Sequence, residues 1–202
     1  MNLENIILLQ SLVRGFLVRN NVLVIPSYIQ TKDWRKKQKW YYGGKKNECE
    51  IYQRNLIEQI TNNKCEKTNE RIKMCDYKIY NKNFPLKEKD GFEYTEDFDG
   101  KILHNNNKCY YYNLKFICDD GGAQTRSLRE VYHFVKVQLE YLLLHKTQNI
   151  YFINILDGNT SYKYMDKFIY LLHTNEKYNI IKNFMFIGDL YDFQKWWNKI
   201  IK

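Results

Sequence analysis

The sequence predicts an α/β domain in which a mixed sheet is flanked by helices, and three observations support this fold class. Short apolar runs typical of strands alternate with segments that carry apolar residues at helical spacing. A predicted hairpin precedes a strand–helix–strand order, which favours a sheet with both antiparallel and parallel pairs. The sequence has no glycine-rich phosphate loop of the P-loop or dinucleotide-binding type, so it gives those nucleotide-binding folds little support.

The first element is a predicted amphipathic helix in residues 1–24. Apolar residues between Asn2 and Arg19 recur at spacings of three and four, and Pro26 ends the stretch that follows. We assign residues 25–202 to the α/β domain.

A basic segment comes next, at Thr31–Lys46, where Lys and Arg interleave with Trp and Tyr. Such a segment can pair with phosphates and stack on bases. Aromatic residues at this spacing more often anchor a loop or a core, so the segment is only supporting evidence for nucleic-acid binding.

A second helix is predicted at Asn47–Ile60. Its expected buried side consists of Ile51, Leu56, Ile57 and Ile60. The polar stretch Asn62–Lys89 is predicted to be an irregular loop with one short strand at Tyr77–Tyr80.

The remaining elements form the predicted hairpin and the alternating strands and helices after it. Asn105–Asn107 is the expected hairpin turn, and Ser127 with Glu130 fits a capping box at a helix start. The strands are Phe98–Leu103, Cys109–Cys118, Ile150–Leu156 and Asn183–Gly188, and the helices are Ser127–His145, Tyr162–Leu172 and Tyr191–Ile201.

Two of the later strands are followed by acids, Asp157 and Asp189. At the end of an open sheet such acids can form a site, although a helix cap or a turn is the more common role.

Charge and cysteine usage bear on partners and location. The chain carries 32 Lys and Arg against 23 Asp and Glu, for a net charge of +9 at pH 7. This excess points to a polyanionic partner, nucleic acid before a membrane surface, or else serves solubility alone. The five Cys lack C-x-x-C spacing, and no apolar run is long enough to span a bilayer. We expect free thiols and an intracellular protein without a membrane segment or a signal peptide.

The N-terminal helix carries a short motif: Leu9-Gln10, then Arg14-Gly15, then Arg19. This pattern resembles the IQ motif, which implies a calmodulin-like partner bound through Gln10, Arg14, Gly15 and Arg19. The alternative is an ordinary amphipathic helix that packs on its own domain.

A second constellation lies in the predicted hairpin. Asp99 begins one strand, and Asn113 and Lys115 share a face of the next. An acid opposite an x-x-Lys strand resembles the PD-(D/E)XK nucleases, whose order of helix, hairpin, helix and strand is also similar. The alternative is a surface hairpin in which Asp99 and Lys115 form a salt bridge.

Within that superfamily, the chain resembles type II restriction endonucleases that cut at GATC. The similarity covers about residues 93–140: Phe98-Asp99, Asn113-Leu114-Lys115-Phe116, Gly121-Gly122 and the polar segment Ala123–Tyr132. The resemblance implies a Mg²⁺-dependent DNA endonuclease and a homodimer. It makes Asp99 the principal metal ligand and Lys115 the group that orients or deprotonates the attacking water.

One residue departs from the family pattern, because Asn113 stands where a Glu is expected. An amide oxygen can ligate Mg²⁺ but brings no charge, so Asn113 would be an attenuated ligand. Either another acid compensates or the protein binds nucleic acid without cutting it. The candidate compensating acids are Asp97, Asp119, Asp120, Glu50 and Glu58.

The segment after the hairpin contains the predicted DNA contacts. Two glycines before a helix let backbone amides approach a phosphate, and nearby Arg side chains add charged donors. The predicted contacts are Gly121, Gly122, Gln124, Arg126 and Arg129. The alternative is a tight turn with solvated Arg side chains. An IQ helix on a nuclease suggests a eukaryotic cell, in its cytoplasm or nucleus, or a large virus of such a cell.

Overall fold

The structure is a computed structural model that describes residues 22–44, 46–81, 95–104, 107–119, 121–147 and 149–200. The predicted IQ motif, with Gln10, Arg14, Gly15 and Arg19, lies outside the described residues, as does Asp120.

The main sheet has four strands in the order β4-β5-β6-β7. These are β4 (Gly100–Leu103), β5 (Cys109–Phe116), β6 (Ile150–Asp157) and β7 (Met185–Gly188). β4 pairs antiparallel with β5, whereas β5–β6 and β6–β7 are parallel. The predicted mixed sheet is therefore confirmed, and the largely apolar sequence of β6 reflects burial on both of its faces.

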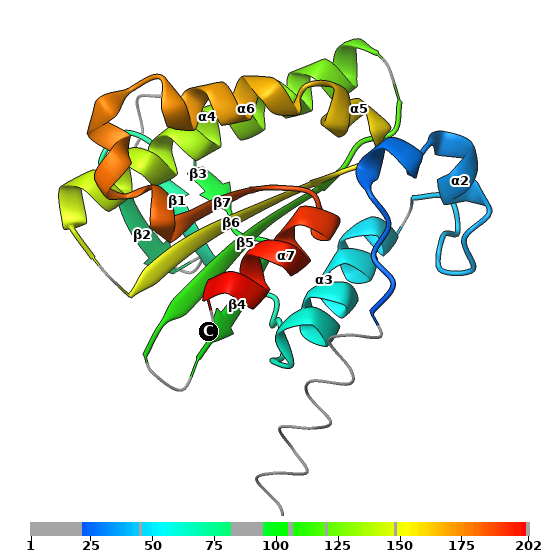
Figure 1. Cartoon of the computed structure of the whole chain (residues 1–202), viewed down its shortest axis with the longest axis horizontal. Coiled ribbons are helices and arrows are strands. Elements are labelled where there is room, and N and C mark those ends of the chain that lie inside the picture. Colours follow the sequence, from blue (N-terminus) through cyan, green and yellow to red (C-terminus); the bar gives the residue numbers. More distant parts are fainter. Residues whose placement is uncertain are drawn as a thin grey trace, which may run out of the picture.

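Helices cover both faces of this sheet (Figure 1). α4 (Gly122–His145) and α6 (Met165–His173) lie on one face, and α3 (Glu48–Thr61) and α7 (Leu190–Ile200) lie on the other. The fold is thus a three-layer α/β arrangement. The shorter helices are η1 (Ser27–Ile29), α2 (Lys32–Lys36), α5 (Asn159–Lys163), η2 (Glu176–Ile180) and η3 (Lys182–Phe184).

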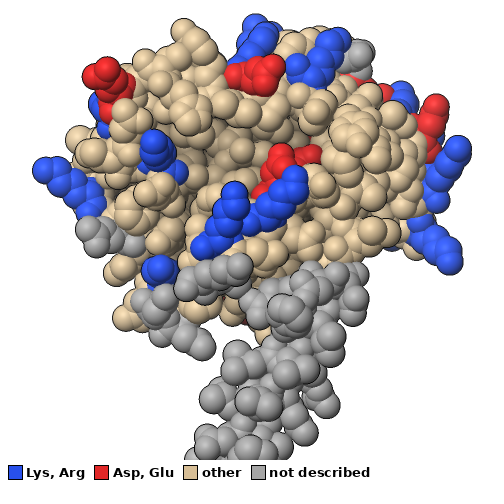
Figure 2. All heavy atoms as spheres, viewed as in Figure 1, with Lys and Arg blue, Asp and Glu red and all other residues tan. Residues whose placement is uncertain are grey.

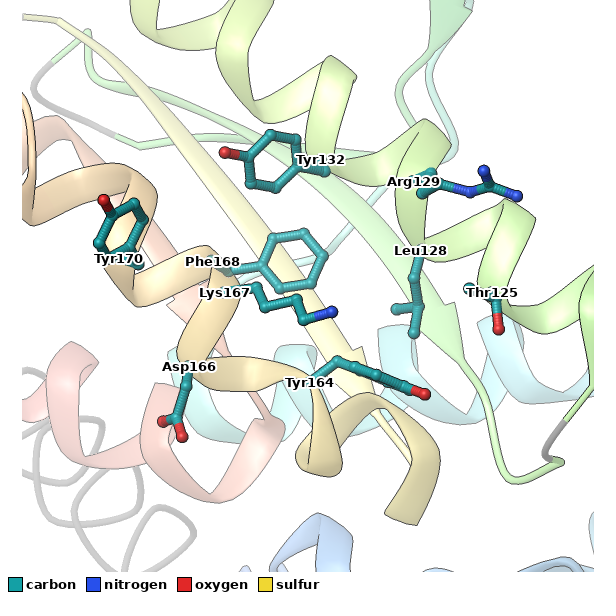
Figure 3. A pocket seen from close by; sticks show the side chains of 9 residues that line it. All are labelled: Thr125, Leu128, Arg129, Tyr132, Tyr164, Asp166, Lys167, Phe168 and Tyr170. Carbon is teal, nitrogen blue, oxygen red and sulfur yellow. The ribbon is translucent and has the colours of Figure 1, made fainter.

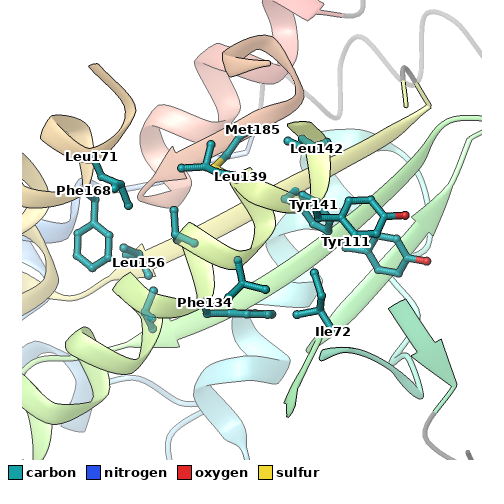
Figure 4. Packing of buried hydrophobic residues seen from close by; sticks show 14 of the residues in the cluster. Ile72, Tyr111, Phe134, Leu139, Tyr141, Leu142, Leu156, Phe168, Leu171 and Met185 are labelled. Carbon is teal, nitrogen blue, oxygen red and sulfur yellow. The ribbon is translucent and has the colours of Figure 1, made fainter. Parts of the chain in front are cut away.

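Each helical layer has its own hydrophobic core. On the α4 side, Phe134 and Leu139 pack with Leu156 of β6 and Leu171 of α6 (Figure 4). On the α3 and α7 side, the cluster includes Ile57, Tyr112, Ile153, Phe193 and Trp197.

The side chains of β5 alternate between these two layers. Tyr112 and Leu114 belong to the α3 and α7 cluster, while Tyr111 belongs to the α4 cluster. Asn113 and Lys115 continue the side of Tyr111. This alternation places the side chains of Asn113 and Lys115 on the face of the sheet that α4 covers.

The segment predicted to be a loop contains most of a second sheet. Its strands are β1 (Glu70–Lys73), β2 (Lys78–Asn81) and β3 (Thr95–Asp97), antiparallel and in the order β2-β1-β3. Only the strand near Tyr77–Tyr80 was expected. Ile72 anchors this sheet in the α4 core, and β3 leads directly into Phe98 and Asp99.

Several sequence-based boundaries were wrong. α4 begins at Gly122 and not at Ser127, because the backbone carbonyl of Gly121 already accepts the amide of Thr125, 3.1 Å away. The expected capping box therefore lies inside the helix. A break at Tyr164 divides the helix expected at Tyr162–Leu172 into α5 and α6.

On α3, the expected buried side is only partly correct. Ile57 and Ile60 are buried, but Ile51 is 44% exposed. Buried polar residues, including Gln53, take part of that side instead. None of the five Cys residues, all of which the structure describes, forms a disulfide. Among the described residues, no helix has the length and hydrophobicity needed to cross a bilayer.

Candidate active site

Asp99 and Lys115 meet where β4 and β5 pair. Asp99 follows β3 and accepts the backbone amide of Leu114 through its Oδ2 atom, at 2.7 Å. The same Oδ2 atom lies 3.8 Å from the Nζ atom of Lys115. The predicted juxtaposition of an acid and a lysine across the hairpin is therefore confirmed, and so is the ion pair expected of a purely structural hairpin.

Lys115 also lines a small cavity of about 40 Å³. Its polar walls are Glu96, Asn113, Lys115 and Glu130, and Val131 and Phe134 of α4 complete the lining. The predicted common face of Asn113 and Lys115 is thus confirmed. The cavity brings together β3, β5 and α4, three elements that are remote in the sequence.

Sequence reasoning missed Glu96 and Glu130 as site residues. Glu130 was interpreted as part of a capping box, but α4 extends through it and places Glu130 and Phe134 one turn apart on the same side. Glu96 belongs to β3, which lay outside every predicted element. A signal for Glu96 was present in the sequence, since it stands only three residues before Asp99.

Two of the carboxyl groups near Lys115, those of Glu96 and Asp99, have pKa values above their ordinary range. Burial raises the pKa of Glu96, and the charges of Glu130 and Asp99 raise it further, while Lys115 opposes the shift. Burial likewise raises the pKa of Asp99, against the opposing effects of Lys115 and the Leu114 amide. The site therefore concentrates negative charge that one lysine only partly balances.

Asn113 belongs to a buried amide network. Its Nδ2 atom donates to Oδ1 of Asn154 at 3.0 Å. That oxygen also accepts from Nε2 of Gln138, and Asn154 donates back to Oε1 of Gln138 at 2.7 Å. The amide at position 113 thus joins β5 to β6 and α4. The oxygen is the atom of this amide that could ligate a cation, and the hydrogen bond made by the nitrogen does not occupy it.

A second buried network lies behind the site. Gln53 of α3 donates through Nε2 to the backbone carbonyl of Lys115 at 3.0 Å and to Oδ2 of Asp157 at 2.7 Å. The Oδ1 atom of Asp157 accepts from the Ser27 hydroxyl and the Leu190 amide, each at 3.2 Å. Asp157 is fully buried, so its role here is to connect strand, helices and N-terminal segment.

The other strand-end acid, Asp189, is a helix cap, as the common role predicted. Its Oδ1 atom accepts the amide of Asp192 at 2.9 Å, and its Oδ2 atom accepts the amide of Ser27 at 2.8 Å.

The compensating acids suggested by the sequence have other partners. Asp97 pairs with Arg71 in the small sheet and does not share a strand with Asp99. Asp119 pairs with Lys32 and Arg35, Glu50 pairs with Arg54, and Glu58 accepts the amide of Cys65. None of these four is part of the cavity lining.

Across the described ranges, no three Asp, Glu, His or Cys side chains are grouped closely enough to hold one ion.

The predicted DNA contacts form the start of α4. Gly121 precedes the helix and Gly122 begins it, and both are exposed, as are Arg126 and Arg129. Gln124 is partly exposed. These positions follow β5 directly, so they lie next to the Lys115 end of that strand.

The basic segment lies against this same end of β5. Lys32 reaches Asp119 at 2.9 Å, and the Trp34 ring stacks on that of Phe116. Trp40 stacks on Tyr52 of α3 with 4.3 Å between ring centroids. These aromatic residues anchor the segment, as the more conservative interpretation predicted, while Lys36, Lys37 and Lys39 remain exposed. On the face seen in Figure 2, basic side chains are scattered and do not form a single patch.

Comparison with models of known protein families, with curated proteins and with solved structures gives no match for this chain.

Proposed function

We propose that this protein is a Mg²⁺-dependent endonuclease that hydrolyses DNA phosphodiester bonds, similar to a type II restriction endonuclease. The observation that carries the proposal is the meeting of Asp99 and Lys115 at the edge of a cavity that Glu96, Asn113 and Glu130 also line. A lysine near the end of β5, close to carboxylates that are partly buried or exposed, is suited to a polarised phosphate and an attacking water.

The order of elements supports the same proposal. α3, the β4–β5 hairpin, α4 and β6 follow one another in the chain, and the parallel β6 pairs with the strand that carries Lys115. This is the order of helix, hairpin, helix and strand on which the resemblance to PD-(D/E)XK nucleases was based.

In this proposal each side chain has a distinct part in hydrolysis. Lys115 orients or deprotonates the attacking water, whose oxygen forms a bond to phosphorus while the bond to the leaving sugar oxygen breaks. The water gives up one proton in this step, and the leaving sugar oxygen keeps the bonding electron pair and takes up a proton. Glu96, Asp99, Glu130 and the amide oxygen of Asn113 are hard oxygen donors of the kind Mg²⁺ prefers. The bound ion would supply charge neutralisation on the phosphate. Burial raises the pKa values of Glu96 and Asp99, and a bound cation would favour the ionised form of both carboxyl groups.

The exposed start of α4 would hold the DNA backbone through Gly121, Gly122, Gln124, Arg126 and Arg129. Cutting both strands of a symmetric site calls for two copies related by a twofold axis, so a homodimer on DNA belongs to this proposal.

The test is cleavage of supercoiled plasmid by the purified chain with Mg²⁺ and with EDTA. We expect nicked and linear products only with Mg²⁺, and cleavage about a hundredfold slower or worse by Lys115→Ala, by analogy with the loss of a charge-stabilising group. Lys182→Ala is the matched control, because Lys182 is an exposed lysine before the start of β7. Equal cleavage by the Lys115 and Lys182 variants would exclude the proposed site.

A second function is favoured by one observation, the use of the Asn113 amide in a buried network. A protein that keeps the fold of this site but lacks a complete set of metal ligands would bind nucleic acid without cutting it. DNA binding by the wild-type chain, with no cleavage under any divalent cation, would identify this catalytically inactive form. The proposed calmodulin-like partner of the N-terminal motif has a separate test, a pull-down with Gln10→Ala/Arg14→Ala as the control.

A further inference from the structure

A cavity of about 540 Å³ lies between α4 and α6, outside the candidate active site (Figure 3). Its volume is in the range of small-molecule pockets, about 300–1,000 Å³. Leu128 and Tyr132 of α4 line one side, and Tyr164 and Phe168 line the other. The walls are therefore largely aromatic and aliphatic, although the cavity is open to solvent.

The aromatic walls include exposed faces as well as a buried floor. Phe168 is buried and its ring centroid lies 5.9 Å from that of Tyr132. Tyr132 and Tyr164 are only partly buried. A planar ring entering the cavity would thus find aromatic surfaces against which to stack.

Cations surround these tyrosines. The Nζ atom of Lys167 lies 4.9 Å from the ring centroid of Tyr164, and that of Lys136 lies 5.4 Å from the ring of Tyr132. Arg129 lines the cavity and is exposed. Lys136 lies outside the lining, which contains the basic residues Arg129 and Lys167 and the acidic residue Asp166, so the cavity combines an aromatic surface with a small excess of positive charge.

The cavity lies close to the candidate active site along the chain. Leu128 and Tyr132 line it, whereas Glu130 and Phe134 line the active-site cavity. Two residues along an α-helix correspond to a rotation of about 200°, so the two cavities flank the same turns of α4. A strand held by the start of α4 would have access to both.

We propose that this cavity binds a nucleotide, with the base stacked against Tyr132 and Tyr164 and the phosphate paired with Arg129 and Lys167. Stacking of bases on aromatic side chains, together with cationic contacts to the backbone, is the general mode by which proteins bind unpaired nucleotides. If the nucleotide is an unpaired residue of a bound DNA strand, the proposal rests on the proposed function. A free nucleotide has the same chemistry, and the experiment separates the two sources.

The first measurement is binding of deoxyadenosine monophosphate, followed by calorimetry, with deoxyribose 5-phosphate as the ligand that lacks a base. We expect binding of the nucleotide and none of the sugar phosphate at the same concentration. Tyr164→Ala should weaken nucleotide binding about tenfold, and Tyr164→Phe, which keeps the ring, should retain it. Nucleotide binding that is unchanged in Tyr164→Ala, or absent in the wild type and in the strand experiment below, overturns the proposal.

The second measurement identifies the source of the nucleotide. Fluorescence anisotropy compares a single-stranded oligonucleotide and a blunt hairpin duplex on the same variants, without Mg²⁺. If Tyr164→Ala weakens binding of the single strand but not of the hairpin, the ligand is an unpaired nucleotide of a strand. If it affects only the mononucleotide, the ligand is a free nucleotide. Should Tyr164→Ala not fold, Thr125→Trp fills the cavity from an exposed position of its lining and is expected to weaken binding similarly.

Plasmid cleavage with Mg²⁺ separates this inference from the proposed function. Cleavage without any contribution of Tyr164 to binding leaves the nuclease proposal and removes the nucleotide cavity. Binding that depends on Tyr164, in a chain that never cleaves, removes the nuclease proposal and leaves the cavity.

Discussion

At the scale of single residues, the structure places two polar side chains in buried hydrogen-bond networks that the sequence did not predict. Asn113 is held in place by Asn154, whose Oδ1 atom accepts two amide donors. A carboxylate at position 113 would set an acceptor against that acceptor. Asp157 is a fully buried carboxyl group with donors from Ser27 and Gln53. Both residues therefore stabilise the fold beside the site, whatever part Asn113 takes in metal binding.

The amide network leads to a prediction for Asn113→Asp. We expect its free energy of unfolding to fall by about 1–3 kcal/mol without metal, because a buried hydrogen bond is replaced by two opposed acceptors. Urea denaturation at pH 7.5 measures this, and Asn55→Asp, at an exposed position of α3, is the control. If the introduced carboxylate takes part in a metal site, added Mg²⁺ should recover part of the lost stability. A metal-free variant as stable as the wild type would contradict the role given to the amide.

Asp157 leads to a prediction about pH. Burial raises the pKa of Asp157 from its ordinary value of 3.8 to about 7, an effect that the donors from Gln53, Leu190 and Ser27 oppose. Between these values the folded protein keeps a proton that the unfolded chain loses. The free energy of unfolding should therefore fall as pH rises from about 4 to about 7.

The side chain of the Asp157→Asn variant does not titrate. The free energy of unfolding of this variant should therefore depend less on pH between about 4 and about 7 than that of the wild type. Urea denaturation at pH 4.5 and pH 7.5 measures the difference between the two pH values in wild type and variant. Because Glu96 and Asp99 also have raised pKa values, the comparison with the wild type is the readout. Asp166→Asn, at an exposed position, is expected to keep the wild-type slope. An Asp157→Asn variant with the wild-type slope would show that this carboxyl group is ionised when folded.

At the scale of elements, the connections between strands and helices decide where the site lies. β6 turns into α5 at Gly158, which has φ +95° and donates its amide to the Gln30 side chain at 3.0 Å. A Cβ atom there would overlap the backbone of Ile117, just beyond β5. Gly122, by contrast, begins α4 with open space around its Cα atom. The two glycines therefore have different physical reasons for being present.

We predict opposite effects for the two alanine substitutions. Gly158→Ala should lower the free energy of unfolding by at least about 2 kcal/mol, through positive φ and the clash with Ile117. Gly122→Ala should raise it by about 0.5 kcal/mol, since alanine loses less backbone entropy in a helix. Thermal unfolding of both variants tests the pair. A tolerated Gly158→Ala would mean that the turn after β6 is arranged differently.

At the scale of the whole molecule, some of the exposed basic residues behind the net charge of +9 lie in the segment next to the end of β5. The basic segment lies beside the end of β5 through Trp34 and Lys32, and its Lys36, Lys37 and Lys39 are exposed. The start of α4 contributes further basic residues to the same region. A DNA duplex bound at the candidate active site would therefore meet cations from two remote parts of the chain.

This arrangement predicts a local effect on salt-dependent DNA binding. Replacing Lys36, Lys37 and Lys39 by Gln should weaken DNA binding. The negative slope of log K against log salt should also become shallower, by up to about 0.9 for each phosphate that no longer pairs with a lysine. Fluorescence anisotropy measures DNA binding at salt concentrations from about 50 to about 200 mM, a range over which electrostatic binding to DNA weakens steeply. The control replaces Lys78, Lys182 and Lys199, which are exposed but outside this segment. Equal slopes for both triple variants would assign the excess charge to solubility alone.

Periodicity by itself determined the fold class and most elements of the α/β core. The apolar runs of β6 and β7 and the stripe of α4 reflect burial against neighbours that every compact arrangement of this chain requires. The opposed Asp99 and Lys115 were also predictable, because a hairpin brings its two strands together through local pairing.

Only the tertiary structure decided which acids accompany that pair. Glu96 and Glu130 reach the cavity because β3 and α4 pack against β5, and such packing between distant segments leaves no periodic signal. The compensating acids named from the sequence had been chosen for their proximity along the chain, but ion pairs with Lys32, Arg54 and Arg71 occupy three of them. The sequence thus determines the hairpin and its lysine, and the packing of remote elements determines the charge around it.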